Sequence, residues 1–213
     1  MIKKISPESS YAIRELSSSL DGPSKDHWRA AMRYIEYLKE HKPYLKLRST
    51  NSFQIIAYCD ANYATDPDDR KSISGYIITL RGSIVSWGCK KSQIVSLSSC
   101  ESEYIENVIC AQEIRYVQQM VKELTGETRP AVSFEDNNGA IFITRHNHVG
   151  PRTKDTDGQQ PHYLTIEKLK GELNPSDILT KNVMEATQVL HITSQRRSDS
   201  TCIQVHQGCP RCR

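Results

Sequence analysis

Side chains from Phe53 to Asp60 fall on two faces with a period of two, and two stretches rich in strand-forming residues follow, so the pattern predicts three adjacent antiparallel strands. The first stretch begins at Phe53 and reaches Asp60, on the face opposite Phe53. Two further stretches, at residues 72–80 and 83–91, are joined at Arg81-Gly82, whose composition is typical of a tight hairpin. We therefore expect the carboxylate of Asp60 to leave the end of a buried strand.

Helical spacing of apolar residues dominates on both sides of these strands. Two helices are predicted before them, at about residues 6–20 and 24–40. After them we predict a helix from Ser98 or Ser99 to about Leu124, a strand at 131–136, a helix at 138–146, a strand at 162–170 and a final helix from Asn174. The apolar stripe of the long helix is predicted to comprise Ile105, Val108, Ile109, Val117, Val121 and Leu124.

This order divides the chain into three parts. Residues 1–50 form a helical preface, and residues 51–184 form an α/β domain of three strands, helix, strand, helix, strand and helix. Residues 185–213 show no sustained periodicity, and we predict a poorly ordered tail there.

Charge and apolar content limit the classes of protein to which the chain could belong. Its 213 residues carry 28 Lys and Arg against 25 Asp and Glu, so the net charge of +3 does not by itself indicate a nucleic-acid-binding protein. No apolar run approaches the roughly 20 residues that span a bilayer, and the first ten residues lack the apolar segment of a secretory signal. We expect a soluble, intracellular protein without a membrane partner.

The seven cysteines are an odd number and lack the spacing of a secreted disulfide scaffold. We expect the first four to be reduced core residues, namely Cys59, Cys89, Cys100 and Cys110. The remaining three lie in the tail, and their spacing is not that of a nucleic-acid zinc knuckle, so no zinc site is predicted.

Four acidic residues stand at strand ends or in the first turns of helices, where a folded sheet could bring them together. They are Asp60, Glu103, Asp136 and Asp177. Crowded carboxylates repel one another and need cations, and sites made of oxygen ligands suit Mg²⁺ or Mn²⁺. Two such ions about 4 Å apart activate a water and stabilise the leaving oxygen of a phosphodiester. The pattern therefore indicates a candidate metal centre.

Each acid also has a purely structural interpretation, so the pattern alone leaves the function open. Asp60 could form a turn, Asp136 could cap the following helix, and Asp177 could interact with a helix dipole. Glu101 stands three residues after a possible cap, which favours a capping-box role for it. Glu103 points to a different side of the helix and is the candidate ligand.

Four blocks of the sequence, in order, resemble the ribonuclease H domain at the end of the copia-type retrotransposon polyprotein. They are YCDANYATDPDDRKSISGYI (58–77), SIVSWGCKKSQIVSLSSCESEYIENV (83–108), FEDNNGAIF (134–142) and NPSDILTKN (174–182). Residues 10–39 are similar to the end of the reverse transcriptase that precedes this domain. The likeness covers about residues 10 to 184.

The resemblance implies a ribonuclease H-like fold, a mixed five-stranded sheet in the order 3-2-1-4-5 with helices on both faces. It implies an endonuclease that cuts the RNA strand of RNA–DNA hybrids with two Mg²⁺ or Mn²⁺ ions. The catalytic and metal-binding acids of the family match Asp60, Glu103, Asp136 and Asp177. The implied protein partner is the reverse transcriptase of the same polyprotein, and the implied location is the cytoplasm, virus-like particles or the nucleus.

Four basic residues would then face the phosphates of the hybrid, namely Arg70, Lys71, Lys90 and Lys91. Ordinary solvated charges are an equally good interpretation of the same residues. A hybrid would be read through its shape, its backbone and its ribose hydroxyls rather than through its base sequence.

The chain departs from the family pattern between residues 155 and 163. Asp155 stands where the family has His, and GQQPHY replaces most of a helix that Gly158 and Pro161 would break in any case. Loss of that helix would uncover one sheet face and could displace Asp177. The alternative hypothesis is therefore a degenerate, catalytically inactive remnant that at most binds nucleic acid.

Overall fold

The computed structural model describes residues 6–41, 45, 47, 50, 52–146 and 164–181 of the chain. The predicted tail at 185–213 and the departure at 155–163 lie outside these residues.

The described elements follow the order that the sequence predicts. The N-terminal part holds a 3-10 helix η2 (Pro7–Ser9), α1 (Ser10–Ser18) and α2 (Lys25–His41). The sheet region comprises β1 (Ile55–Asn62), β2 (Ile73–Leu80), β3 (Ser83–Lys91), α3 (Ser99–Thr125), β4 (Ala131–Glu135), α4 (Asn138–His146), β5 (Leu164–Lys168), a 3-10 helix η3 (Gly171–Leu173) and α5 (Asp177–Thr180). None of the helices described is long and apolar enough to span a bilayer.

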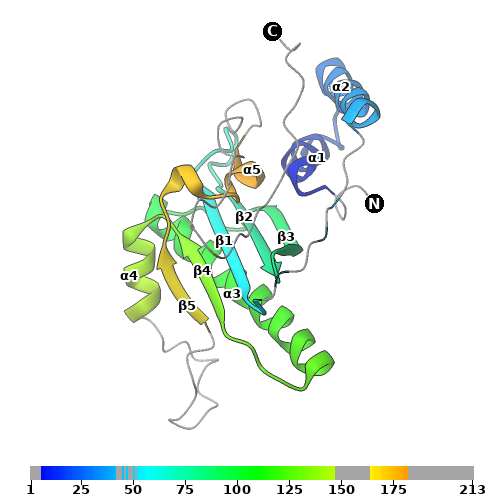
Figure 1. Cartoon of the computed structure of the whole chain (residues 1–213). Coiled ribbons are helices and arrows are strands. Elements are labelled where there is room, and N and C mark those ends of the chain that lie inside the picture. The colour runs from blue at the N-terminus through cyan, green and yellow to red at the C-terminus, as the bar shows by residue number, and fades with distance from the viewer. Residues whose placement is uncertain are drawn as a thin grey trace.

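The strands form one mixed sheet in the order β3-β2-β1-β4-β5, which confirms the predicted fold class (Figure 1). β2 is antiparallel to β1 and to β3, whereas β4 is parallel to β1 and to β5. A parallel neighbour requires a crossover connection, and α3 lies in the one that leads to β4. Because β1 and β4 run side by side in one direction, their carboxyl ends meet at the same edge of the sheet.

Asp60 lies inside β1, so the expectation that it ends the strand is wrong by two residues. The strand continues to Asn62, and Asp60 pairs with Gly75 of β2. The pairing of β1 with β4 stops earlier, at Tyr58. The backbone of Asp60 is therefore held by the sheet from the β2 side, while its β4 side is open to side chains from other elements.

The predicted hairpin between β2 and β3 is present. Arg81 and Gly82 both adopt the left-handed region, with φ of 53° and 78°. Two consecutive residues with positive φ are typical of the two-residue turn whose twist matches that of the flanking strands. The turn thus fixes the register of β3 against β2.

The helix α3 covers one face of the sheet. The core there joins Ile55, Ala57 and Cys59 of β1 to Cys110, Ile114, Val117 and Val121 of α3. The predicted apolar stripe is right at Val117 and Val121 but wrong at Val108 and Leu124, which are 40% and 83% exposed. An α-helix of 27 residues is about 40 Å long, longer than the eight-residue β1 at about 27 Å, so its last turn projects past the sheet.

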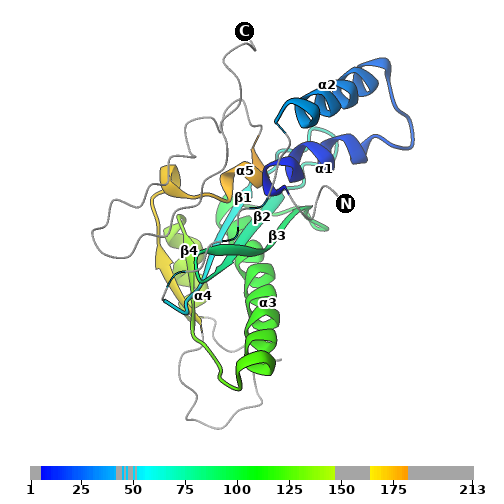
Figure 2. The ribbon, with the colours of Figure 1, turned by 45° about the vertical axis from the view of Figure 1, so that its right-hand side comes forward.

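The short helix α5 and the helix α1 lie on the opposite face (Figure 2). Ile178 and Leu179 of α5 pack with Ile77 of β2 in a second buried cluster. α2 is different, because it buries none of its residues and its Trp28 is 69% exposed. The apolar spacing that predicts α2 is therefore not matched by a covered face within the described chain.

Gly75 lets α5 approach the sheet, and a side chain there should be destabilising. A Cβ at this position would lie 2.7 Å from Cβ of Leu179 and 2.8 Å from Cγ2 of Thr180. We expect Gly75→Ala to lower the free energy of unfolding by about 1–3 kcal/mol, the range typical of overpacking. Gly22→Ala is the matched control, because a Cβ at Gly22 meets nothing within 4 Å. Urea unfolding of both variants tests this, and equal midpoints would contradict it.

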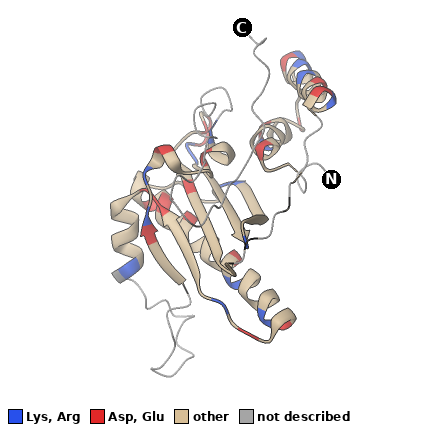
Figure 3. Cartoon of the chain, viewed as in Figure 1, with Lys and Arg blue, Asp and Glu red and all other residues tan. Residues whose placement is uncertain are grey.

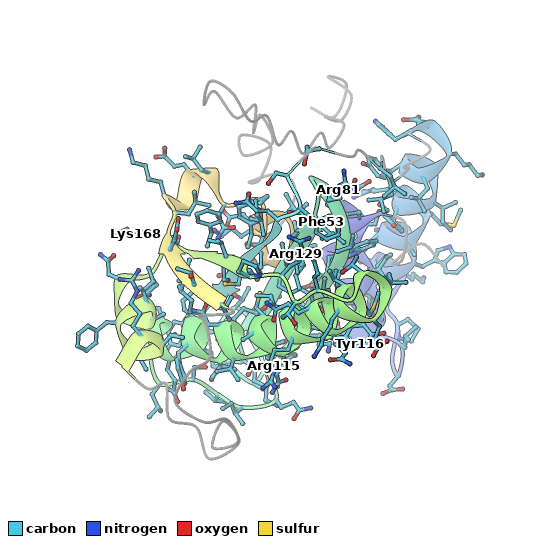
Figure 4. All side chains as sticks on the ribbon, turned by 60° about the horizontal axis from the view of Figure 1, so that its bottom comes forward. Phe53, Arg81, Arg115, Tyr116, Arg129 and Lys168 are labelled. Carbon is cyan, nitrogen blue, oxygen red and sulfur yellow. The ribbon has the colours of Figure 1, made fainter. Side chains whose placement is uncertain are left out.

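Two arginines hold the start of β1, at the end of the strand remote from Asp60. Arg81 and Arg129 lie over the ring of Phe53, 5.3 and 5.1 Å from its centroid (Figure 4). Nε of Arg81 also donates to the carbonyl of Thr50 at 3.0 Å. Contacts of this kind contribute about 0.5–1 kcal/mol each at exposed sites. They anchor the segment that leads into the central strand.

The described cysteines are all free, as predicted, but only two of them belong to the core. Cys59 and Cys110 are fully buried, whereas Cys89 and Cys100 are half-buried. The alternation within β1 explains Cys59, which faces α3 together with Ile55 and Ala57.

Candidate metal centre

Three acidic side chains from three separate elements converge near the carboxyl ends of β1 and β4. Asp60, Glu103 and Asp136 each offer a carboxylate oxygen, and these oxygens all lie within 4.8 Å of one another. They come from β1, from the second turn of α3 and from the residue after β4. Figure 3 shows acidic positions gathered at this end of the sheet. The spatial cluster thus contains three of the four acids that the sequence singles out.

Asp60 is held from the α5 side. It is 3% exposed, and the hydroxyl of Thr180 donates a hydrogen bond to its Oδ2. Burial, and next the charge of Asp177, raise the pKa of Asp60 to about 6. A neutral donor therefore fixes the carboxylate of Asp60, while burial and the acidic neighbours destabilise its ionised form. A cation bound beside it would stabilise that ionised form.

Glu103 is positioned by the start of α3. Ser98 caps this helix by accepting from the backbone N–H of Glu101, and Glu101 accepts in turn from the N–H of Leu97 at 2.6 Å. These bonds confirm that Glu101 helps to cap α3, although its carboxylate accepts from Leu97, one residue before the Ser98 N–H that a capping box would use. Glu103 instead faces the sheet, where its Oε2 accepts from the N–H of Ala61 at 2.9 Å. Burial first, and then the charge of Glu135, raise the pKa of Glu103 to about 10.

Asp136 follows β4 directly, in a turn whose backbone N–H groups are hydrogen-bonded to the preceding residue, Glu135. The carboxylate of Glu135 accepts the N–H groups of Asp136 and Asn137 at 2.9 and 3.0 Å. Asn137 caps α4, since its Oδ1 accepts from the N–H of Gly139 at 2.9 Å and from that of Ala140 at 3.1 Å. The interpretation of Asp136 as the cap of this helix is therefore wrong, because Asn137 provides the cap.

Asp177 lies beside the cluster without being one of the three. It is the first residue of α5 and 6% exposed, and its Oδ2 forms an ion pair with Nζ of Lys181 at 2.8 Å. Its Oδ1 is buried without a hydrogen-bond partner in the described chain. Burial raises the pKa of Asp177, and its charge in turn raises that of Asp60. The fourth acid is therefore adjacent to Asp60, and it has one unsatisfied oxygen.

Two further acids behind the cluster were not predicted as part of the site. Glu135 is fully buried and accepts from Nδ2 of Asn107 at 2.8 Å, and burial foremost raises its pKa to about 7. Glu106 is also fully buried, and burial foremost raises its pKa to about 8. Glu135 could have been found from the sequence, because it shares the inward face of β4 with Ala131 and Ser133. Glu106 lies one helical turn after Glu103, on a neighbouring position of α3.

The four basic residues divide into two kinds. Nζ of Lys91 bonds Asp66 at 2.6 Å and Asp69 at 3.0 Å, and Nζ of Lys71 bonds Asp69 at 3.1 Å. The pair of Lys71 lies within the loop between β1 and β2, and the two pairs of Lys91 join this loop to the end of β3. Arg70 and Lys90 are exposed. The structural interpretation therefore accounts for Lys71 and Lys91, and a role toward phosphates is open to Arg70 and Lys90.

The donor set fits a hard divalent cation. Carboxylate oxygens are ligands that Mg²⁺ and Mn²⁺ prefer, and three of them lie close enough together here to bind one ion. Burial first, and then neighbouring carboxylates, raise the pKa values of Asp60 and Glu103, and a bound cation would favour their charged forms. Asp177, which interacts with Asp60, has an Oδ1 that is buried without a hydrogen-bond partner among the described residues.

Comparison with curated proteins finds relatives among transposon polyproteins. The chain is 29% identical over 185 residues to the retrovirus-related Pol polyprotein from transposon TNT 1-94 of Nicotiana tabacum, covering 83% of the chain and 14% of the polyprotein. It is 36% identical over 185 residues to that from transposon RE2 of Arabidopsis thaliana, covering 85% and 12%. It is also 33% identical over 121 residues to the secreted RxLR effector protein 161 of Plasmopara viticola, covering 56% and 85%. The chain thus spans about one seventh or less of the length of the polyproteins it matches.

No family model matches the chain. Among solved structures, it is similar to LC11-RNase H1 in complex with an RNA/DNA hybrid, with a TM-score of 0.40 and 14% identity over 59% of the chain and 93% of that protein. It is also similar to the N-terminal RNase H domain of rv2228c from Mycobacterium tuberculosis, with a TM-score of 0.42 and 10% identity over 63% and 96%. The order and the directions of the five strands identify the ribonuclease H-like fold. By its sequence the chain is homologous to a short segment of the retrovirus-related Pol polyproteins of plant transposons, and its five-stranded sheet is ribonuclease H-like in strand order and strand direction.

Proposed function

We propose that the chain is an endonuclease that hydrolyses the RNA strand of RNA–DNA hybrids with divalent cations bound at its acidic cluster. The observation that carries the proposal is the convergence of Asp60, Glu103 and Asp136 within 4.8 Å from three separate elements. The homology to transposon Pol polyproteins and the resemblance of four sequence blocks to their ribonuclease H domain supply the substrate class.

Each acidic residue has a proposed role in metal binding that follows from its position. Asp60, Glu103 and Asp136 would hold the cation, and Asp177 beside Asp60 would complete a second position. When bound, Mg²⁺ or Mn²⁺ supplies an activated water and charge stabilisation for the leaving oxygen. The burial of Asp60 and Glu103 excludes water from their surroundings and strengthens their interaction with positive charge. The proposed site binds two such ions.

The hybrid would be held by its backbone. Arg70 and Lys90 are exposed and are the proposed phosphate contacts. We further propose that residues 1–50 are the end of the preceding reverse transcriptase and that the domain comprises residues 51–184. The contact of α1 with α5 and β3 supports a rigid connection between them.

Cleavage of a labelled RNA–DNA hybrid tests the function. We expect the wild-type chain to cut the RNA strand in Mg²⁺ or Mn²⁺, to stop in EDTA and to leave DNA duplexes intact. Asp60→Asn should reduce the rate by on the order of a thousandfold, because a ligand is lost from the cation. Asp68→Asn, in the exposed turn between β1 and β2, is the matched control and should cut like the wild type.

The result also decides between enzyme and remnant. A chain that binds the hybrid in a salt-sensitive way but does not cut it in any divalent cation would be the inactive remnant. Cutting that Asp60→Asn leaves unchanged would show that the activity comes from another site or from a contaminant.

A further inference from the structure

We propose that Thr180 is a positioning residue that fixes the carboxylate of Asp60 for cation binding, a role that rests on the proposed function of the acidic cluster. Thr180 is fully buried, and its hydroxyl donates to Oδ2 of Asp60. A donor on one oxygen stops the carboxylate from rotating and leaves the other oxygen, Oδ1, for the cation. Hydrogen bonds of a hydroxyl to a carboxylate are about twice as strong as neutral ones.

The segment that carries Thr180 is itself tied to β1 on both sides of Asp60. Nδ2 of Asn174 donates to the carbonyl of Cys59 at 2.7 Å, and Nδ2 of Asn62 donates to the carbonyl of Thr180 at 3.2 Å. Asn174 is fully buried, and its Oδ1 accepts from the backbone N–H of Ser176 at 3.2 Å and from the hydroxyl of Ser176. These bonds place the Thr180 hydroxyl without help from any group in the acidic cluster.

The sheet is shaped to receive this segment. Asp60 pairs with Gly75, and a Cβ on Gly75 would lie 2.8 Å from Cγ2 of Thr180. Only a residue without a side chain lets Thr180 come so close beside Asp60. Among the described residues the hydroxyl has one other acceptor in reach, the carbonyl of Asp177 at 3.3 Å, and the charged Oδ2 is the stronger of the two.

The test compares Mn²⁺ affinity among matched threonine variants. Thr180→Val keeps the shape of the side chain and removes the hydroxyl, and Thr180→Ser restores it. Thr79→Val is the control, because Thr79 of β2 is 1% exposed and its hydroxyl donates to the carbonyl of Ile56 on the neighbouring strand β1, which also carries Asp60. Binding of Mn²⁺ is followed by calorimetry, with thermal unfolding to verify that each variant is folded and with steady-state cleavage of the hybrid.

We expect Thr180→Val to weaken Mn²⁺ binding by about 10–100-fold, the range for residues that orient a metal ligand. Its kcat should fall while the KM for the hybrid stays within about twofold, and Thr180→Ser should recover Mn²⁺ affinity to within about threefold of the wild type. Unchanged Mn²⁺ affinity in Thr180→Val, or an equal loss in Thr79→Val, would overturn the positioning role. A wild-type chain that binds Mn²⁺ with this Thr180 dependence but does not cut would retain the role and refute the nuclease function. A wild type that binds no Mn²⁺ would overturn both.

Discussion

Glu103→Gln is expected to abolish metal-dependent cleavage while leaving the metal-free fold intact. Glu103 is 6% exposed, and its pKa is raised to about 10, so near neutral pH without metal it is a neutral acid. Gln is the uncharged isostere of that acid, and its amide oxygen can still accept from the N–H of Ala61. The cation, by contrast, requires the carboxylate. We expect a loss of activity on the order of a thousandfold, larger than the 10–100-fold of residues that only orient ligands.

The same helix provides the control for this variant. Glu101→Gln lies two residues earlier, where either side chain can accept the N–H of Leu97 as a cap. We expect it to cut at the wild-type rate. Thermal unfolding in EDTA at pH 7 should give both variants a Tm within about 2 °C of the wild type, less than 1 kcal/mol for a domain of this size. Addition of Mg²⁺ should raise the Tm of Glu101→Gln but not that of Glu103→Gln. Full activity in Glu103→Gln would remove this residue from the site.

The second large effect is a loss of stability with rising pH that divalent cations reverse. The pKa values of four buried acids are raised in the folded chain, to about 6 for Asp60, 7 for Glu135, 8 for Glu106 and 10 for Glu103. The folded state therefore keeps protons that the unfolded chain has already released. Because the unfolded state binds fewer protons in this range, the free energy of unfolding decreases as pH increases. This stability is fully present below the ordinary carboxyl pKa values of about 4, and it is lost progressively as pH rises through the folded values, from about 6 for Asp60 to about 10 for Glu103.

Thermal unfolding between pH 5 and 8 in EDTA checks the direction. We expect the Tm to fall by on the order of 5–10 °C across this range, from a change of a few kcal/mol in stability. Mg²⁺ should reduce the fall by half or more, since a bound cation favours the charged carboxylates. KCl at equal ionic strength is the control, because it screens exposed charges but does not occupy the cluster. A Tm in EDTA that stays level or rises over this range would contradict the raised pKa values.

Local signals in the sequence predicted much of this molecule. The Arg81-Gly82 hairpin, the Ser98 cap with Glu101 and the alternation within β1 are all as expected. Each depends on residues a few positions apart, whose backbone preferences do not need the rest of the fold. The errors have a different origin. The exposure of Leu124 reflects the length of α3 relative to the sheet, and Asp60 lies inside β1 because pairing with Gly75 extends the strand.

The candidate site shows the same division. Periodicity and the resemblance to a known domain selected Asp60, Glu103, Asp136 and Asp177, but pattern alone could not bring these four residues together. The roles of Asn137 as a cap and of Lys91 in an ion pair came only from the structure. Thr180 was missed because a hydroxyl on a one-turn helix has no distinctive spacing in the sequence, whereas the alternation within β4 could have indicated that Glu135 faces inward.

The sequence by itself determined the order of strands and helices, the turn and the cap, and the similarity to transposon Pol polyproteins, since these depend on short-range preferences and on residue identity. The tertiary structure decided that Asp60, Glu103 and Asp136 share one point, that Thr180 lies against Asp60, and that Lys71 and Lys91 are paired. The physical reason is that a carboxylate acquires its raised pKa and its partners only when distant segments exclude water around it. Contacts between segments up to 120 residues apart are set by the packing of the whole sheet.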